Sequence, residues 1–205
     1  MIDSIILNDI SYRYDDKYVI NNFNSTFYQN NIYGLFGKNA SGKSTLLKLI
    51  AGILKPQLGK IEYHKNHTPI NSKINVQNRI TFSAPYINFV PELTPKENYF
   101  IISKLKGQNI DNDKLETLLD LFSLRDFYNK RIDQLSTGTI SKFKLNLNLI
   151  FESNINLFDE PFENIDEQSK NNFINYITKS HNNKIIIISS TKKEELNFSE
   201  YLLTL

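Results

Sequence analysis

A glycine-rich turn between an apolar strand and a helix constrains this chain most. The run Gly37–Ser44 reads GKNASGKS and fits the pattern GxxxxGKS. The preceding residues, Ile32–Phe36, predict a buried strand, and those from Thr45 onward predict a helix. Such a turn directs backbone N–H groups and the positive helix end at one place, which favours an anion there. The alternative is an ordinary strand–helix turn that matches by chance.

The same pattern indicates which atoms would hold a phosphate. Lys43 can reach the outer phosphates of a nucleotide, and the hydroxyl of Ser44 can bind Mg²⁺. We therefore expect a nucleotide whose phosphates contact the following residues: Gly37, Lys38, Asn39, Ala40, Ser41, Gly42, Lys43, Ser44 and Thr45.

Composition narrows the class of protein. The 205 residues suffice for one large α/β domain, with or without a small inserted subdomain. A net charge of +2 gives no reason to expect nucleic acid as a partner, and the absence of cysteine fits a reducing compartment. No stretch approaches the roughly 20 apolar residues of a membrane span, and the N-terminus does not resemble a signal peptide. We expect a cytoplasmic protein, unless a partner holds it at a membrane.

The order of expected elements indicates a largely parallel sheet. Strand-like pieces open the chain, at Ser4–Leu7, Ser11–Tyr14, Ser25–Tyr28 and Ile32–Phe36. A helix over Gly42–Ile53 follows, ended by Lys55-Pro56, and a short strand is expected at Lys60–Tyr63. Residues 92–152 are mostly helical in pattern, with a stripe at Leu115, Leu118, Leu119 and Phe122. Strands and helices then alternate, at Ile155–Phe158, Glu167–Ser180, Lys184–Ser189, Lys192–Leu196 and Tyr201–Leu205.

One stretch fits two structures. Leu145, Leu147 and Leu149 alternate with asparagines, as they would in a strand, whereas Phe143, Leu147 and Ile150 fit a helix equally well. We predict a helix, because the uninterrupted stretch from Ile140 to Phe151 is long for a single strand.

Two acids follow an apolar strand in the second half of the chain. Ile155–Phe158 is followed directly by Asp159 and Glu160. A carboxylate at the carboxyl end of a strand beside a phosphate loop can hold Mg²⁺, which is the role we predict for Asp159. Glu160 would then face the γ-phosphate and orient the attacking water. The alternative is a strand that ends in a solvated acidic turn.

Further motifs resemble those of the ATP-binding-cassette (ABC) ATPase family. Leu135–Thr139 reads LSTGT, which is similar to the family signature LSGGQ, and its Ser136 lies 19 residues before Ile155. The resemblance covers essentially the whole chain and extends to three more motifs: Leu93–Asn98 (family pattern LTxxEN), Asp159-Glu160-Pro161 (the acidic motif) and Asn164-Ile165-Asp166 (the D-loop).

The resemblance implies an α/β fold with a P-loop NTPase (RecA-like) core. That core has a mostly parallel sheet, an N-terminal antiparallel β subdomain and an inserted α-helical subdomain. We expect a single ABC ATPase domain over 1–205, with the core in 1–85 and 153–205 and the helical subdomain in 86–152. Because the last strand ends near Leu205, we expect no regulatory domain after it.

The resemblance also implies a site shared by two chains, with ATP between the phosphate loop of one and the signature of the other. Ser136 and the N–H of Gly138 would face the γ-phosphate, and the end of the following helix favours an anion independently. Ser136 can equally be a helix N-cap. Tyr14, 23 residues before Gly37, occupies the place of the adenine-stacking aromatic, or else is a sheet-face aromatic. Asp166 is expected at the nucleotide as part of the D-loop.

The sequence departs from the family at two positions. Pro85 stands where the family has a glutamine that contacts Mg²⁺ or its water, and Thr191 stands where it has a histidine that contacts the γ-phosphate. Thr191 is therefore a candidate catalytic residue, whose hydroxyl can donate one hydrogen bond but carries no charge. Because Glu160 is present, we predict hydrolysis that is measurable but slow; alternatively, a different ATPase subunit supplies the complete site.

The function implied is that of an ATP-hydrolysing transporter subunit. We expect it to power transport, with a lean towards export, through separate transmembrane permease subunits and with a second ATPase subunit, identical or related. It would lie in the cytoplasm, peripheral on the inner face of the cell membrane, with no nucleic-acid partner. The membrane subunit would dock near Pro85–Leu93, on Ile87, Phe89 and Val90. The alternatives are an ABC ATPase acting on nucleic acid or ribosomes, and a nearly inactive ATP-binding regulatory subunit.

Overall fold

Two compact units make up the protein. The computed structural model describes residues 1–70 and 76–205. The first unit comprises Met1–Phe82, Ser153–Glu160 and Lys179–Leu205; the second comprises Ser83–Glu152 and Pro161–Thr178. The predicted helical segment 86–152 lies within the second unit, which also takes in 161–178 from the segment that we had assigned to the core.

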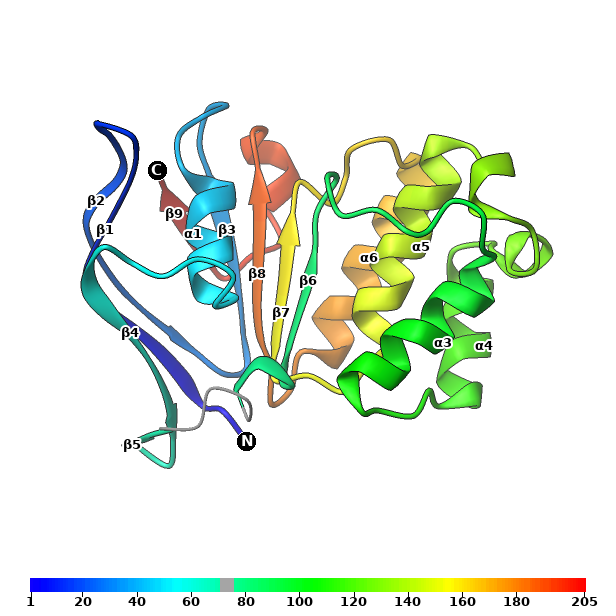
Figure 1. Ribbon diagram of the computed structural model, residues 1–205, viewed down its shortest axis with the longest axis horizontal. Coiled ribbons are helices and arrows are strands. Elements are labelled where there is room, and N and C mark those ends of the chain that lie inside the picture. The colour runs from blue at the N-terminus through cyan, green and yellow to red at the C-terminus, as the bar shows by residue number, and fades with distance from the viewer. Residues whose placement is uncertain (71–75) are drawn as a thin grey trace. The chain divides into compact units, whose positions relative to one another are not determined.

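The first unit contains two sheets (Figure 1). The antiparallel sheet has the order β2-β1-β4-β5, with bounds Lys17–Tyr28, Ser4–Tyr14, Leu58–Lys65 and Thr68–Pro69. The second sheet has the order β6-β7-β8-β3-β9, with bounds Ile80–Ser83, Ile155–Asp159, Ile185–Ser190, Asn31–Phe36 and Tyr201–Thr204. In this sheet β7, β8, β3 and β9 run parallel, which confirms the predicted α/β class.

A single apolar core joins the two sheets to helix α1 (Lys43–Ile50), which lies beside β3 in Figure 1. Four residues of α1, Leu46, Leu47, Leu49 and Ile50, are at most 1% exposed. All residues of β7 and β8 are buried, which explains their nearly continuous apolar sequences, since central strands of a parallel sheet are covered on both faces.

The second unit contains helices α3 (Pro95–Lys106), α4 (Asn112–Leu121), α5 (Thr137–Ile150) and most of α6 (Glu167–Ser180). The predicted stripe of α4 is confirmed, because all four of its members are buried. The fully buried Tyr99 of α3 packs edge-on against Phe143 of α5, and its hydroxyl lies 2.8 Å from Phe143 O and 3.0 Å from Asn146 Oδ1. Among the described residues, no helix is long and apolar enough to cross a bilayer.

The ambiguous stretch is a helix, as predicted. Asn146 and Asn148, which would lie on the solvent face of an alternating strand, are 0% and 4% exposed. The Asn146 carbonyl oxygen lies within hydrogen-bond distance of the Tyr99 hydroxyl, which links this buried polar side chain to α3, whereas its Nδ2 has no partner among the described residues.

Several predicted boundaries were wrong. The strand pieces Ser4–Leu7 and Ser11–Tyr14 form one strand, β1, whose register shifts beside Asp9, a residue with φ 52°. Helix α1 ends at Ile50 rather than Ile53. Gly52, with φ 71°, turns the chain, and the N–H groups of Ile53 and Leu54 both bond back to Lys48 O. The Lys55-Pro56 pair therefore follows the helix end without causing it.

Helix α3 begins with a capping box that explains the LTxxEN motif. Thr94 Oγ1 accepts from Glu97 N at 3.2 Å, and Glu97 Oε2 accepts from Thr94 N at 2.8 Å. These bonds lower the pKa of the Glu97 carboxyl, the backbone bond from Thr94 most strongly. The last residue of the motif, Asn98, is 3% exposed and bonds both Val90 N and Val90 O, which anchors the preceding loop.

Removal of the cap should destabilise the second unit. Thr94→Ala leaves Glu97 N without its side-chain acceptor and should lower the free energy of unfolding by about 1 kcal/mol, measured by urea denaturation. Thr117→Ala is the matched control, because its hydroxyl bonds Asp113 O inside α4; that change should stay within about 0.5 kcal/mol. Equal losses for the two variants would contradict the cap.

Candidate active site

The sequence-predicted groups of the first unit meet at the carboxyl edge of the parallel sheet. In the strand registers, Ser189 of β8 pairs with Leu35 of β3 on one side and with Asp159 of β7 on the other. Three segments therefore meet at one edge of the sheet: the loop after β3, the two acids at the end of β7 and the residues after β8. This edge is where open α/β sheets place their ligands.

The loop after β3 leads into a helix N-terminus that has no side-chain cap. The N-cap of α1 is Gly42, with φ 105°, and its first turn contains no acid. By contrast, α3, α4 and α5 all begin with a residue whose side chain accepts a backbone N–H: Thr94, Asp111 and Ser136. The first N–H groups of α1 thus remain available for an external anion.

Glycine is required at both ends of this loop. A Cβ on Gly37 would lie 2.8 Å from the backbone oxygen of Leu205, and one on Gly42 would lie 2.8 Å from Val19 O, which belongs to β2. Ser41 Oγ is buried and has no hydrogen-bond partner among the described residues. The tight backbone cradle and this hydroxyl fit a bound phosphate, the group that the motif predicts.

Lys43 occupies the centre of the loop. Its side chain is buried, and Nζ donates to Gly37 O at 2.7 Å and to Lys38 O at 3.2 Å. Nζ also lies 3.3 Å from Glu160 Oε1, so the ammonium is neutralised by the acid predicted to orient water. The predicted phosphate-binding lysine and catalytic glutamate therefore lie side by side.

The two acids are held by β8 and the residue after it. Asp159 is 2% exposed and accepts from Ser189 Oγ at 2.6 Å, while Glu160 N donates to the same Ser189 Oγ at 3.0 Å. The other carboxylate oxygen of Glu160 accepts from Thr191 N at 3.2 Å. Glu160 has φ 45°, a left-handed conformation that is uncommon for this residue type and is found at functional sites.

The adenine candidate lies in the hairpin that backs the loop. Tyr14 ends β1, is 46% exposed and packs edge-on against Tyr12 at 5.1 Å. The same β1–β2 hairpin supplies Val19 and Ile20, the two residues that the missing Cβ of Gly42 would meet. The ring of Tyr14 thus presents an exposed face on the element that contacts the phosphate loop.

The two positions at which the chain departs from the family pattern, Pro85 and Thr191, lie in different units. Thr191 is in the first unit and contacts Glu160 through its backbone, as described above. Pro85 is in the second unit, is exposed, and uses its carbonyl to accept from Lys144 Nζ at 2.6 Å. Gln77, the glutamine nearest to Pro85 in the sequence, lines a cavity of about 610 Å³ with Leu54, Tyr63 and Ile80.

In the second unit, the LSTGT loop begins α5 next to the D-loop. Ser136 is exposed and is the N-cap of α5, with Oγ accepting from Thr139 N at 3.1 Å. A Cβ on Gly138 would lie 2.8 Å from Asn164 O, so glycine allows the helix start to approach the D-loop. The N-cap prediction for Ser136 is confirmed, and it leaves the phosphate role open because both can hold at once.

Asp166 joins the starts of two helices. Its carboxylate accepts from Ser169 N at 2.8 Å at the start of α6 and lies 3.3 Å from Lys142 Nζ in α5. The backbone bond from Ser169, followed by those from the Ser169 hydroxyl and Lys142, lowers the pKa of Asp166 to about 2. The carboxylate is therefore ionised at neutral pH and holds these two helix starts together.

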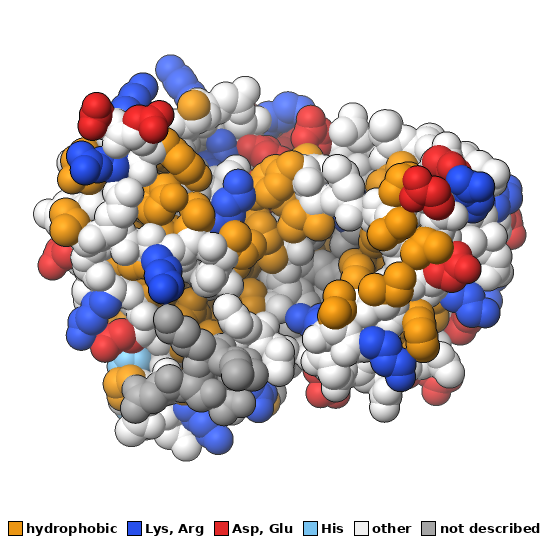
Figure 2. Space-filling model, viewed as in Figure 1, with side chains coloured by type: hydrophobic (Ala, Val, Ile, Leu, Met, Phe, Trp, Pro, Cys, Tyr) orange, Lys and Arg blue, Asp and Glu red, His pale blue; other side chains and the backbone are white. Residues whose placement is uncertain are grey.

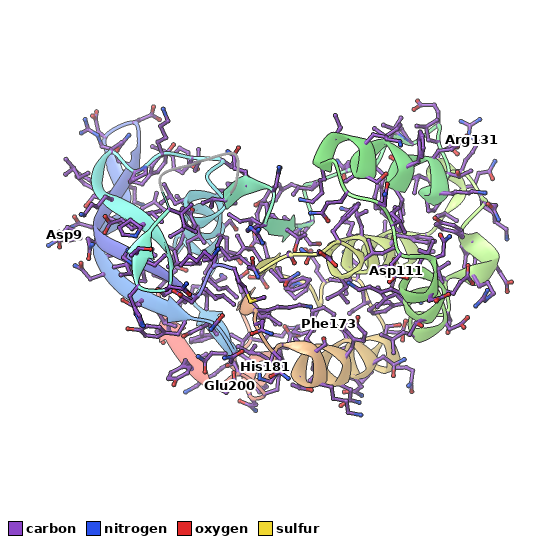
Figure 3. All side chains as sticks on the ribbon, turned by 90° about the horizontal axis from the view of Figure 1, so that it is seen from below. Asp9, Asp111, Arg131, Phe173, His181 and Glu200 are labelled. Atoms are coloured by element: carbon purple, nitrogen blue, oxygen red, sulfur yellow. The ribbon has the colours of Figure 1, made fainter. Side chains whose placement is uncertain are left out.

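Ser189 is a residue of the site that sequence reasoning missed. Its hydroxyl follows the isoleucine run of β8, beside an acidic strand end, and this position was a usable signal. His181, which follows α6, lies near Glu200 in Figure 3, with Nε2 3.7 Å from Glu200 Oε1. Glu200 also accepts from Ile32 N, at the start of β3, so His181 belongs to the edge opposite the phosphate loop.

One predicted docking residue is buried. Phe89 is only 9% exposed and packs against the ring of Tyr99 at 6.2 Å, so the expectation that it is exposed was wrong. Ile87 and Val90 are 40% and 47% exposed, as predicted. Figure 2 shows further hydrophobic side chains on the surface of the second unit, and the exposed ones include Tyr86, Phe100, Ile101 and Leu105.

Comparison with known sequences gives a consistent family. The family model described as "ABC transporter" matches residues 20–163. The ABC transporter ATP-binding protein NatA of Bacillus subtilis is 31% identical over 94% of this chain and 81% of its own length. The Nod factor export ATP-binding protein I of Rhizobium etli is 28% identical over 82% and 53%, and the sulfate/thiosulfate import ATP-binding protein CysA of Chlorella vulgaris is 30% identical over 87% and 75%.

Solved structures agree with this. A Pyrococcus furiosus structure, described as an ABC transporter ATP-binding protein, superposes with a TM-score of 0.82 at 29% identity over 98% of this chain and 97% of that one. A dimeric ATP-binding cassette, MJ0796, captured after hydrolysis with ADP and Pi, has a TM-score of 0.83 at 20% identity over 98% and 94%. The second likeness is one of fold.

The phosphate loop contains one strained residue that a single substitution can relieve. Ala40 has φ 62°, which costs an L-residue about 1–2 kcal/mol, while glycine adopts it readily. Ala40→Gly should raise the free energy of unfolding by about 0.5–1 kcal/mol, measured by thermal or urea denaturation. Ala51→Gly is the matched control: Ala51 has φ −71°, so the same change should destabilise. A loss of stability in both variants would contradict strain at Ala40.

Proposed function

Because the chain belongs to the ABC transporter family, we propose that its phosphate loop and paired acids bind and hydrolyse Mg·ATP to power transport through separate membrane subunits. Membership makes the chain an ATP-binding ATPase module; the roles of its residues are the proposal. The observation that carries the proposal is the position of Lys43, whose buried ammonium lies within 3.3 Å of both the loop carbonyls and Glu160.

The geometry supports an exchange of partners at Lys43. In the structure, Glu160 supplies the negative charge that the ammonium needs. A γ-phosphate in the loop would replace Glu160 as that partner, because its oxygens accept from the ammonium and from the uncapped N–H groups of α1. The Glu160 carboxylate, still bonded by Thr191 N, would then face the phosphate and orient water.

Mg²⁺ fits the neighbouring groups. Ser44 lies in the first turn of α1 and Asp159 at the end of β7, and a hydroxyl and a carboxylate are the oxygen ligands this ion uses beside phosphates. When bound, the ion would neutralise charge that develops on the transferred phosphoryl group. Tyr14 would stack on the adenine through its exposed face.

A second ATPase chain completes the proposed site. Ser136 and Gly138 lie at the exposed N-terminus of α5 and would reach the γ-phosphate held by the partner chain, with Asp166 nearby. The solved MJ0796 cassette is a dimer with ADP and Pi, which supports this arrangement. The proposal covers a second copy of this chain and a related subunit alike.

Membrane subunits would dock on the second unit. The apolar side chains exposed there give a surface suited to such a partner: Tyr86, Ile87, Val90, Phe100, Ile101 and Leu105. The chain would thereby lie on the cytoplasmic face of the membrane. The proposal holds for either direction of transport, since relatives named for export and for import match at similar identity, and the lean towards export stays a prediction.

Loss of the loop lysine should weaken nucleotide binding. Lys43→Ala takes away the charge that meets the outer phosphates, and calorimetry should show Mg·ATP affinity about tenfold to a hundredfold weaker than in the parent. Lys60→Ala is the control, because Lys60 forms an exposed pair with Glu62 in β4; its affinity should equal that of the parent. Parent-like affinity in Lys43→Ala would refute the proposed site.

The switch position should limit the rate. The parent is expected to turn over well below the enzyme median of about 10 s⁻¹, because Thr191 offers no charged group to the γ-phosphate. Thr191→His should raise steady-state turnover about tenfold or more, whereas Thr191→Ser, which keeps both the hydroxyl and the backbone bond to Glu160, should leave it unchanged. Glu160→Gln gives the background rate. Ordinary turnover in the parent would show that the switch is not weakened.

A further inference from the structure

Ser189 bridges the two acids through its hydroxyl. Its side chain is fully buried in β8, between Leu35 and Asp159 in the strand registers. Its hydroxyl donates to Asp159 Oδ1 at 2.6 Å and accepts from Glu160 N at 3.0 Å. The single proton of the hydroxyl is therefore committed to the carboxylate, and one lone pair to the backbone of the next residue.

Both bonds constrain groups that the proposed reaction uses. The bond to Oδ1 is short and charge-assisted, and it fixes the plane of a carboxylate that is only 2% exposed. The bond from Glu160 N holds a residue whose φ of 45° is left-handed, at the point where the chain turns towards Lys43. One hydroxyl thus sets the direction of the Asp159 carboxylate and the backbone conformation of Glu160.

The neighbouring serine shows that this arrangement is specific. Ser190 is equally buried, but its hydroxyl donates to Glu195 Oε2 at 2.6 Å and accepts from Lys192 N at 3.0 Å. It therefore stabilises the turn that follows β8. A serine that only ended the strand would bond in the same local way, whereas both bonds of Ser189 go to β7 and the residue after it.

We propose that Ser189 is a positioning residue for the metal and the attacking water, acting through Asp159 and Glu160. This rests on the proposed function, in which Asp159 binds the divalent ion. Outer-shell groups of this kind orient the ligating carboxylate, and their loss typically weakens metal affinity about 10- to 100-fold. The hydroxyl acts without contacting the nucleotide, so its loss should leave metal-free nucleotide binding unchanged.

The test measures metal binding apart from turnover. The full chain is loaded with a non-hydrolysable ATP analogue, and Mn²⁺ is titrated with detection by electron paramagnetic resonance. Ser189→Ala should bind Mn²⁺ about 10- to 100-fold more weakly than the parent, with unchanged affinity for the analogue in EDTA. Ser189→Thr, which keeps the hydroxyl, should restore the affinity. In turnover assays, Ser189→Ala should lower kcat with little change in the KM for ATP.

Two controls separate the possible failures. Ser11→Ala removes an equally small hydroxyl, 3% exposed, that accepts from Asn22 N in the antiparallel sheet, and should bind Mn²⁺ like the parent. Ser189→Cys preserves the side-chain volume if the alanine variant does not fold, and it too should bind the ion more weakly. Parent-like affinity in Ser189→Ala or Ser189→Cys, with affinity lost in Asp159→Asn, would overturn the role of Ser189 and leave the proposed function intact. Parent-like affinity in Asp159→Asn would overturn both.

Discussion

A buried ammonium needs acceptors, and the first unit is organised around that need. Lys43 is 5% exposed, so water does not compensate its charge, and its partners come from two places in the sequence. The carbonyls of Gly37 and Lys38 belong to the loop after β3, whereas Glu160 follows β7. Only a parallel sheet that brings these strand ends to one edge can satisfy the lysine, and an isolated buried charge would be very costly.

The two units divide the chemistry between them. The first contains the phosphate loop, the acids and Thr191, all within one set of parallel strand ends. The second contains the LSTGT loop, the D-loop and the exposed apolar side chains. Each set is fixed by contacts within its own unit, which suits the proposed arrangement, in which the phosphate site of one chain is closed by a loop of another.

Much of the candidate site could be predicted because its residues sit at strand ends and helix starts. The pattern GxxxxGKS and the acids after Ile155–Phe158 define positions on a parallel sheet without knowledge of which strands are neighbours. Ser189 required that knowledge, since only the β7–β8 register brings its hydroxyl to Asp159. The roles assigned to these residues stay predictions.

Other features depended on tertiary contacts that no local pattern carries. The first half of β2 reads KYVINN, with its apolar residues consecutive rather than alternating, and its pairing with β1 runs through the backbone, so no strand period was there to detect. Phe89 lies in a mostly apolar loop with the exposed Ile87 and Val90, and its burial follows from contact with the ring of Tyr99, a residue ten positions later. The end of α1 at Ile50, just before the turn at Gly52, was missed because the Lys55-Pro56 pair nearby predicts a later stop.

The ion pair between Lys142 and Asp166 couples the positions of two helices. Because Asp166 also caps α6, and because Gly138 lets α5 press against Asn164, a displacement of either helix start is transmitted to the other. The carboxylate keeps its charge down to a pH of about 2, so acidity in the cellular range does not loosen this linkage. A displacement of the turn that contains Ser136 would therefore also shift the start of α6, because Asp166 contacts both helices and Asn164 lies against Gly138.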